Sequence, residues 1–242
     1  MNTVLKEINW LRILLYYAAA LGATYLVRKL PNLLNLLLTQ LTDIPFSFNY
    51  NHGIALLLLS LLFYRLVPVN KQVTFWGINR FKSLLFPLVL FMTYGIYGIK
   101  NDHGINPHIW AILFCALAMG YNIMEEYAWR GYLVNNLEKT PVWIKSLISG
   151  VLWGIWHLFV FDNFDQYGGF AVFMVFCIVF SFILTFAVHR TGSVFVAAAI
   201  HTFLVQMNLA TLICFVLFMF LLVIWNRMHF GNKGNDLPAI PF

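Results

Sequence analysis

Acidic residues are scarce in this chain. Only 9 of its 242 residues are Asp or Glu, and charged residues make up 10% of the total, whereas hydrophobic residues make up 61%. Soluble domains carry about 25% charged residues. The apolar stretches are too many and too evenly spread to leave room for a separate soluble domain. The composition therefore predicts a polytopic membrane protein.

Cysteine is scarce too, and basic residues are not clustered. The three cysteines, Cys115, Cys177 and Cys214, lie in apolar runs and form no CxxC, which excludes a disulfide framework and a cysteine metal cluster. The net charge of +6 is spread between the apolar segments, as in loops that face an anionic membrane surface. We therefore expect membrane lipid as a partner and no nucleic acid.

Apolar runs are abundant, and a spanning helix needs about 20 mostly apolar residues. The shorter run Leu33 to Leu41 is typical of an interfacial helix. We predict an all-α fold: one transmembrane helix-bundle domain at 1–230, followed by a short polar cytoplasmic tail at 231–242. It has about eight spans, or seven if the last two form one kinked helix. The eight segments are Trp10 to Val27, Gly53 to Leu66, Ser83 to Ile99, Ile109 to Leu133, Val142 to Phe161, Phe170 to Val188, Ser193 to Met207 and Leu209 to Trp225.

The distribution of Lys and Arg predicts the orientation. Placing both termini in the cytoplasm leaves Arg28, Lys29 and Lys100 outside and the other twelve of the 15 basic residues inside. We therefore expect a multi-pass protein with both termini cytoplasmic.

Two adjacent glutamates stand out against this apolar background. Glu125 and Glu126 are followed by Arg130, and an ionised carboxylate at the bilayer centre costs about 2.5 kcal/mol or more, so it is usually functional. On a helix Glu126 and Arg130 are neighbours and can pair. Glu125 is rotated by about 100° from Glu126 around the helix axis and does not share that face. We expect Arg130 to neutralise Glu126 and Glu125 to act as a general base on water. The alternative is an ion pair that only sets the helix register.

Two histidines lie deep in later apolar segments. His157 follows Trp153, and His201 follows the run Thr191-Gly192-Ser193. A lone buried histidine is usually structural, but ionisable groups on three helices can converge in a bundle core. We expect no required cofactor; zinc held by Glu125, His157 and His201 is the alternative, although HExxH is absent. Solvated roles are expected for the remaining histidines, His52, His103, His108, His189 and His229.

In this order and spacing, the motifs resemble those of the CAAX protease and bacteriocin-processing (CPBP, or Abi) family of intramembrane proteases. The family pattern is EExxxR, then an aromatic residue separated by three residues from a His, then a His that opens HxxxN or HxxxD. Glu125, Glu126 and Arg130 meet the first block, and Trp153 with His157 meets the second, with Trp in place of the common Phe. The third block is the run that leads to His201, and the resemblance covers residues 120–207.

The resemblance implies an intramembrane endopeptidase, of glutamic type in preference to metallo type. Glu125 would activate the attacking water, His157 would help to position or activate it, and His201 would stabilise the oxyanion. Glu126 and Arg130 would hold the geometry of the site. The substrate would be a membrane-associated precursor, such as a bacteriocin, a pheromone or a lipidated CAAX-type protein, and the compact chain fits a bacterial plasma membrane.

One position departs from the family pattern. Val205 stands four residues after His201, where the pattern has Asn or Asp. Asn208 would lie two turns along the same helix face, about 10 Å away, and Asn122 precedes Glu126 by one turn. Both are candidate oxyanion donors.

The missing amide favours an alternative function of another class. The protein would then be a non-proteolytic membrane regulator or a bacteriocin self-immunity protein, bound to a membrane partner such as a sensor kinase. Buried carboxylates also mark transport paths, but the chain contains no inverted repeat typical of transporters.

Overall fold

The computed structural model describes residues 8–42, 44 and 49–228. The predicted tail at 231–242 lies outside these residues, as does His229. The described secondary structure is helical, and these residues form no strand beyond one isolated bridge between Thr74 and Ser193. The all-α prediction is confirmed.

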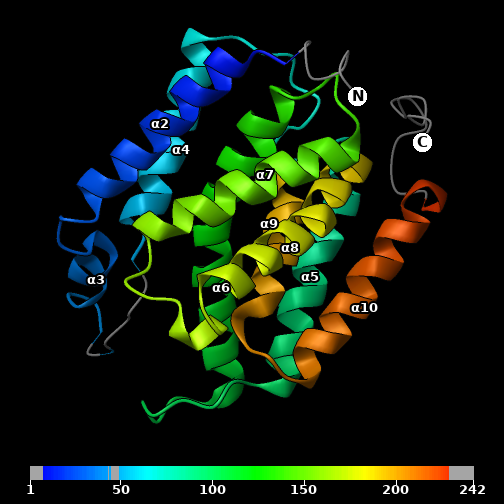
Figure 1. The fold of residues 1–242 in the computed structure, drawn as a ribbon. Helices are drawn as coiled ribbons and strands as arrows, with labels where there is room; N and C mark the ends of the chain where they lie inside the picture. Colours follow the sequence, from blue (N-terminus) through cyan, green and yellow to red (C-terminus); the bar gives the residue numbers. More distant parts are fainter. Residues whose placement is uncertain (1–7, 43, 45–48, 229–242) are drawn as a thin grey trace. The chain divides into compact units, whose positions relative to one another are not determined.

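The helices follow the predicted segments closely. Each of the eight apolar segments is helical, and the predicted interfacial segment contains the short helix α3 (Figure 1). The principal elements are α2 (Trp10–Val27), α3 (Leu33–Leu38), α4 (Asn51–Leu66), α5 (Arg80–Tyr97), α6 (Pro107–Glu126), η1 (Tyr127–Leu133), α7 (Val142–Trp156), η2 (His157–Phe159), α8 (Phe170–Thr191), α9 (Val194–Thr202), η4 (Phe203–Val205) and α10 (Leu209–Ile224).

Five helices among the described residues are long and apolar enough to cross a membrane: Trp10–Val27, Pro107–Leu133, Val142–Phe159, Phe170–Thr191 and Leu209–Arg227. Two shorter apolar helices, Asn51–Leu66 and Val194–Val205, accompany them. The protein is therefore a multi-pass membrane protein. The last two predicted segments are separate helices, because Gln206 is extended and Asn208 caps α10.

The chain divides into two compact units. The first comprises residues 1–72 and 124–186, and the second comprises 73–123 and 187–242. The description of one domain over 1–230 stays a prediction.

In the first unit, polar side chains join α2 to two other helices. The hydroxyls of Tyr16 on α2 and Ser60 on α4 are hydrogen-bonded at 2.8 Å in a buried position, and the two helices run side by side in Figure 1. Tyr17 donates its hydroxyl to the carbonyl of Leu152 on α7 at 2.9 Å. Trp156 Nε1 donates to Thr24 Oγ1 at 2.8 Å. These bonds set the position of α7 against α2.

In the second unit, Tyr94 joins α5 to the end of α9 and to α10. Its buried hydroxyl donates to the carbonyl of Phe203 at 2.6 Å and lies 3.0 Å from Thr211 Oγ1. A buried hydroxyl without partners would be costly. This residue therefore stabilises the turn between α9 and α10.

Two glycines of α7 face α8 within the first unit. A Cβ at Gly150 would lie 2.8 Å from Ile178 Cα and 2.9 Å from Ser181 Cβ, whereas a Cβ at Gly154 would first meet the sulfur of Met174 at 2.6 Å. Small residues four apart allow two membrane helices to approach closely. The close approach at Gly150 holds the part of α7 that carries Trp153.

We predict that Gly150→Ala destabilises the protein more than Gly154→Ala. At Gly150 the added methyl meets the backbone of α8, and forced overpacking costs about 1–3 kcal/mol. At Gly154 it meets the end of a flexible methionine side chain. Thermal unfolding of the two variants in detergent measures the difference. Equal midpoints would show that α7 and α8 are not closely packed at Gly150.

Candidate active site

Glu126 and Arg130 form a buried ion pair. Arg130 Nη1 donates to Glu126 Oε1 at 3.1 Å, and both side chains have an exposed fraction of 0%. An unpaired charge in this environment would cost several kcal/mol. The pairing predicted from the spacing is present.

The local backbone at this pair is a π-helix rather than the continuation of α6. The π-helix η1 begins at Tyr127, directly after Glu126, and residues 128–133 are all buried. π-Helical turns are rare and occur mostly at functional sites. The predicted single helix from Ile109 to Leu133 is correct in extent, but the spacing of apolar residues did not reveal this change of winding.

Trp153 contacts two of the three residues of the glutamate motif, Glu125 and Arg130. Its Nε1 donates to Glu125 Oε2 at 3.0 Å, in a buried hydrogen bond. The guanidinium of Arg130 lies 4.7 Å from the centre of its ring, within the range of a cation–π interaction. The indole therefore orients the carboxylate of Glu125 and also provides a face for the buried cation.

His157 is bonded to the same tryptophan. Its Nδ1 lies 2.8 Å from the carbonyl oxygen of Trp153. A carbonyl oxygen only accepts, so Nδ1 carries the proton, and in the neutral ring Nε2 is then an acceptor. Glu125 and His157 are 2% and 6% exposed. One residue thus sets the orientation of a buried carboxylate and of a buried imidazole.

Aromatic rings surround His157 within the first unit. The ring centres of Trp156, Phe161 and Phe173 lie 4.8, 5.1 and 4.9 Å from that of His157. Such surroundings exclude water and lower the local dielectric, which strengthens each electrostatic interaction inside. The imidazole is therefore held in an apolar, aromatic environment.

In the second unit, the run Thr191-Gly192-Ser193 ends α8 and begins α9. Gly192 has a positive φ of 65°, which glycine adopts without strain. Ser193 Oγ caps α9 by accepting from the N–H of Val196 at 3.2 Å. This turn sets the start of the helix whose last turn carries the half-buried His201.

The two candidate amide donors also lie in the second unit. Asn122 is buried, and its Nδ2 donates to Thr202 Oγ1, next to His201, at 3.0 Å. Asn208 instead caps α10, where its Oδ1 accepts from the N–H of Thr211 and its Nδ2 donates to Gln206 Oε1. The prediction that Asn208 continues the helix of His201 is wrong, because α9 ends at Thr202 and the chain turns before Asn208.

One histidine differs from its predicted environment. The sequence predicts His52 in a loop with a solvated role, but it is buried in the first turn of α4. Its ring centre lies 5.7 Å from that of Trp156. Packing between distant segments buries it, and its local sequence carries no signal of this.

The first unit thus holds Glu125, Glu126, Arg130 and His157, and the second holds His201, Asn122 and Asn208. Within each unit, the described residues contain no group of three His, Cys, Asp or Glu side chains arranged to hold a metal ion. The joint action of the two sets stays a prediction.

A comparison with known protein families gives one match. A family model described as Rce1-like, type II CAAX prenyl endopeptidase, matches residues 104–207. The match contains the predicted core 120–207, and it confirms the resemblance that the motifs indicate. This segment is therefore similar to the Rce1-like family. The curated proteins contain no match to the chain.

We predict that Arg130→Ala lowers the free energy of unfolding by about 3–5 kcal/mol, because it leaves Glu126 charged and buried. The matched control is the double variant Glu126→Leu with Arg130→Met, which removes both charges and should recover most of this loss. Thermal unfolding in detergent measures both. A single variant as stable as the parent would contradict the pairing argument.

Proposed function

We propose that the protein is an intramembrane endopeptidase that uses Glu125 to activate water, and that its substrates are membrane-associated peptide or protein precursors. The observation that supports this most directly is the pair of bonds made by Trp153. They orient the carboxylate of Glu125 and the imidazole of His157 next to one indole, in a buried environment.

The proposed chemistry follows from these two groups. Glu125 takes a proton from a water that His157 Nε2 orients, and the oxygen of that water attacks the scissile carbonyl carbon. The protonated Glu125 then gives its proton to the leaving nitrogen, and the C–N bond breaks. For His201, stabilisation of the oxyanion rests on the family resemblance.

A non-proteolytic membrane regulator is the second candidate, and one observation favours it. Val205 occupies the position of the family Asn or Asp, and it ends a 3₁₀ turn with an aliphatic side chain that donates no hydrogen bond. Such a protein would bind a membrane partner, for example a sensor kinase or the target of a bacteriocin. Peptide cleavage distinguishes the two functions.

We predict that Glu125→Gln lowers kcat/KM for a cleaved peptide by about 10² to 10⁴-fold, the usual contribution of a general base. The assay uses purified protein in liposomes with prenylated peptides and leader peptides, each with and without a chelator. Cleavage that resists the chelator and is lost in the variant supports the glutamate mechanism. Cleavage abolished by the chelator would favour a zinc site of Glu125, His157 and His201.

An absence of cleavage by the folded parent protein across the whole panel would favour the regulator. Full activity of the Gln variant would exclude Glu125 as the base.

We predict that Trp153→Phe lowers kcat/KM by roughly tenfold or more, because it removes a charge-assisted hydrogen bond to Glu125. The matched control is Trp156→Phe, which removes the indole donor to Thr24 but none to Glu125. Steady-state kinetics and thermal unfolding of both variants test this. If both variants lose activity only in proportion to their loss of stability, Trp153 has no role in positioning Glu125.

A further inference from the structure

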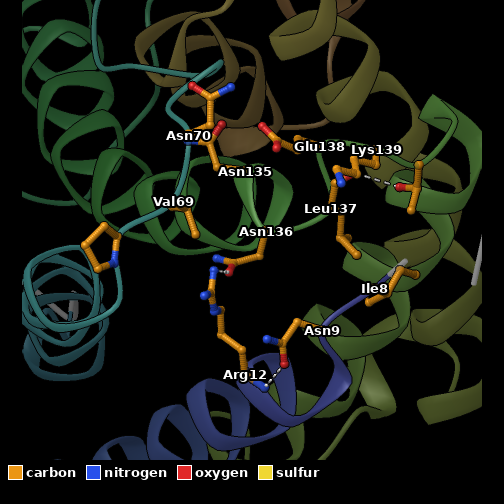
Figure 2. A pocket seen from close by; sticks show the side chains of 12 residues that line it. Ile8, Asn9, Arg12, Val69, Asn70, Asn135, Asn136, Leu137, Glu138 and Lys139 are labelled. Carbon is orange, nitrogen blue, oxygen red and sulfur yellow. Dashed lines mark hydrogen bonds between the residues drawn. The ribbon is translucent and has the colours of Figure 1, made fainter. Parts of the chain in front are cut away.

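A polar cavity lies at one end of the first unit. It has a volume of about 290 Å³ and is lined from three connections: the start of α2 (Ile8, Asn9 and Arg12), residues 68–70 after α4, and residues 135–140 between η1 and α7. Figure 2 shows Arg12 reaching from α2 toward Asn136. Three stretches distant in sequence thus meet around one polar space.

The cavity lies where apolar helices end. α2 begins at Trp10, α4 ends at Leu66, and α7 begins at Val142. Trp10 and Trp143 are exposed at the starts of α2 and α7, and exposed tryptophans at helix ends mark the level of lipid headgroups. This position at the membrane–water boundary favours a lipid over a wholly soluble ligand.

Arg12 supplies the cationic side of the cavity. Among the described residues its guanidinium has one acceptor, Asn136 Oδ1 at 3.4 Å, which is longer than a usual hydrogen bond. The remaining N–H groups suit a phosphate, which arginine binds in bidentate fashion. The start of the 18-residue helix α2 adds a partial positive charge on the same side.

Glu138 supplies a carboxylate to the cavity, next to Lys139 in the same connection. Its Oε2 is buried and has no hydrogen-bond partner in the part of the chain that the structure describes. Lys145 attracts it electrostatically, but a buried acceptor still requires a donor. An ammonium group would provide both the donor and the positive charge.

We propose that this cavity binds the zwitterionic phosphoethanolamine headgroup of a membrane lipid, with its phosphate on Arg12 and its ammonium on Glu138. The predicted orientation places this headgroup in the cytoplasmic leaflet. The site is separate from Glu125 and His157, and the proposal does not depend on proteolysis.

The test is native mass spectrometry of the full chain in detergent, titrated with short-chain phosphatidylethanolamine, phosphatidylglycerol and phosphatidylcholine, and with inorganic phosphate. The parent should bind phosphatidylethanolamine about tenfold more tightly than the other two lipids, because only this headgroup offers Glu138 a hydrogen-bond donor that also carries a positive charge. Inorganic phosphate should not compete at matched concentration. Competition by phosphate at that concentration would assign the site to a soluble anion and would overturn the proposal that it binds a lipid.

Three variants test the two contacts separately. Arg12→Gln should weaken the binding of all three lipids by about tenfold, and Arg12→Lys should recover part of the lost affinity. Glu138→Gln should remove the preference for phosphatidylethanolamine and leave phosphatidylglycerol unchanged. The matched control, Arg65→Gln, removes an exposed charge at the end of α4 outside the cavity and should change nothing.

Equal effects of Arg12→Gln and Arg65→Gln would show that only surface charge attracts lipid. An unchanged preference in Glu138→Gln would show that the ammonium is not bound there. Either result overturns the proposal.

Discussion

A guanidinium buried among apolar helices has to be neutralised, and Arg130 is neutralised by Glu126 at 3.1 Å. The same guanidinium lies on the face of Trp153, whose Nε1 bonds to Glu125 and whose carbonyl oxygen bonds to His157. The groups proposed to act on water are therefore linked to the ion pair through one residue, Trp153: Glu125 through its indole and His157 through its backbone carbonyl. Because each contact is buried, the loss of one charge would affect the whole arrangement.

The arrangement depends equally on the position of α7. Gly150 lets this helix approach the backbone of α8, and Tyr17 and Thr24 on α2 bond to Leu152 and Trp156 of α7. Trp153 lies on the same stretch of helix. Close packing leaves it little freedom, which is what a preorganised site requires.

The polar groups of the first unit lie in two different kinds of surroundings. Around Glu125 and Arg130, an ion pair, an indole donor and an aromatic face lie within an apolar interior, although Arg130 Nε and Nη2 have no hydrogen-bond partner among the described residues. At the helix ends, Arg12 and Glu138 line a cavity of about 290 Å³. The first arrangement carries the proposed chemistry on water, and the second carries the proposed recognition of a lipid headgroup.

The sequence by itself determined the elements whose causes are local. The apolar runs predicted the helices to within a few residues, because a spanning helix must be long and apolar. The spacing of Glu126 and Arg130 predicted their pairing, because residues four apart are neighbours on a helix. The three motif blocks indicated a family resemblance, which the family model over residues 104–207 confirms.

Only the tertiary structure decided the rest. Trp153 was expected as an aromatic residue of a motif, but its role as a donor depends on Glu125, 28 residues away. The proton on Nδ1 of His157, the burial of His52 and the cavity at Arg12 likewise follow from contacts between distant segments. Hydrophobic periodicity does not encode such contacts, because it reports which face of a helix is buried and not which residue it meets.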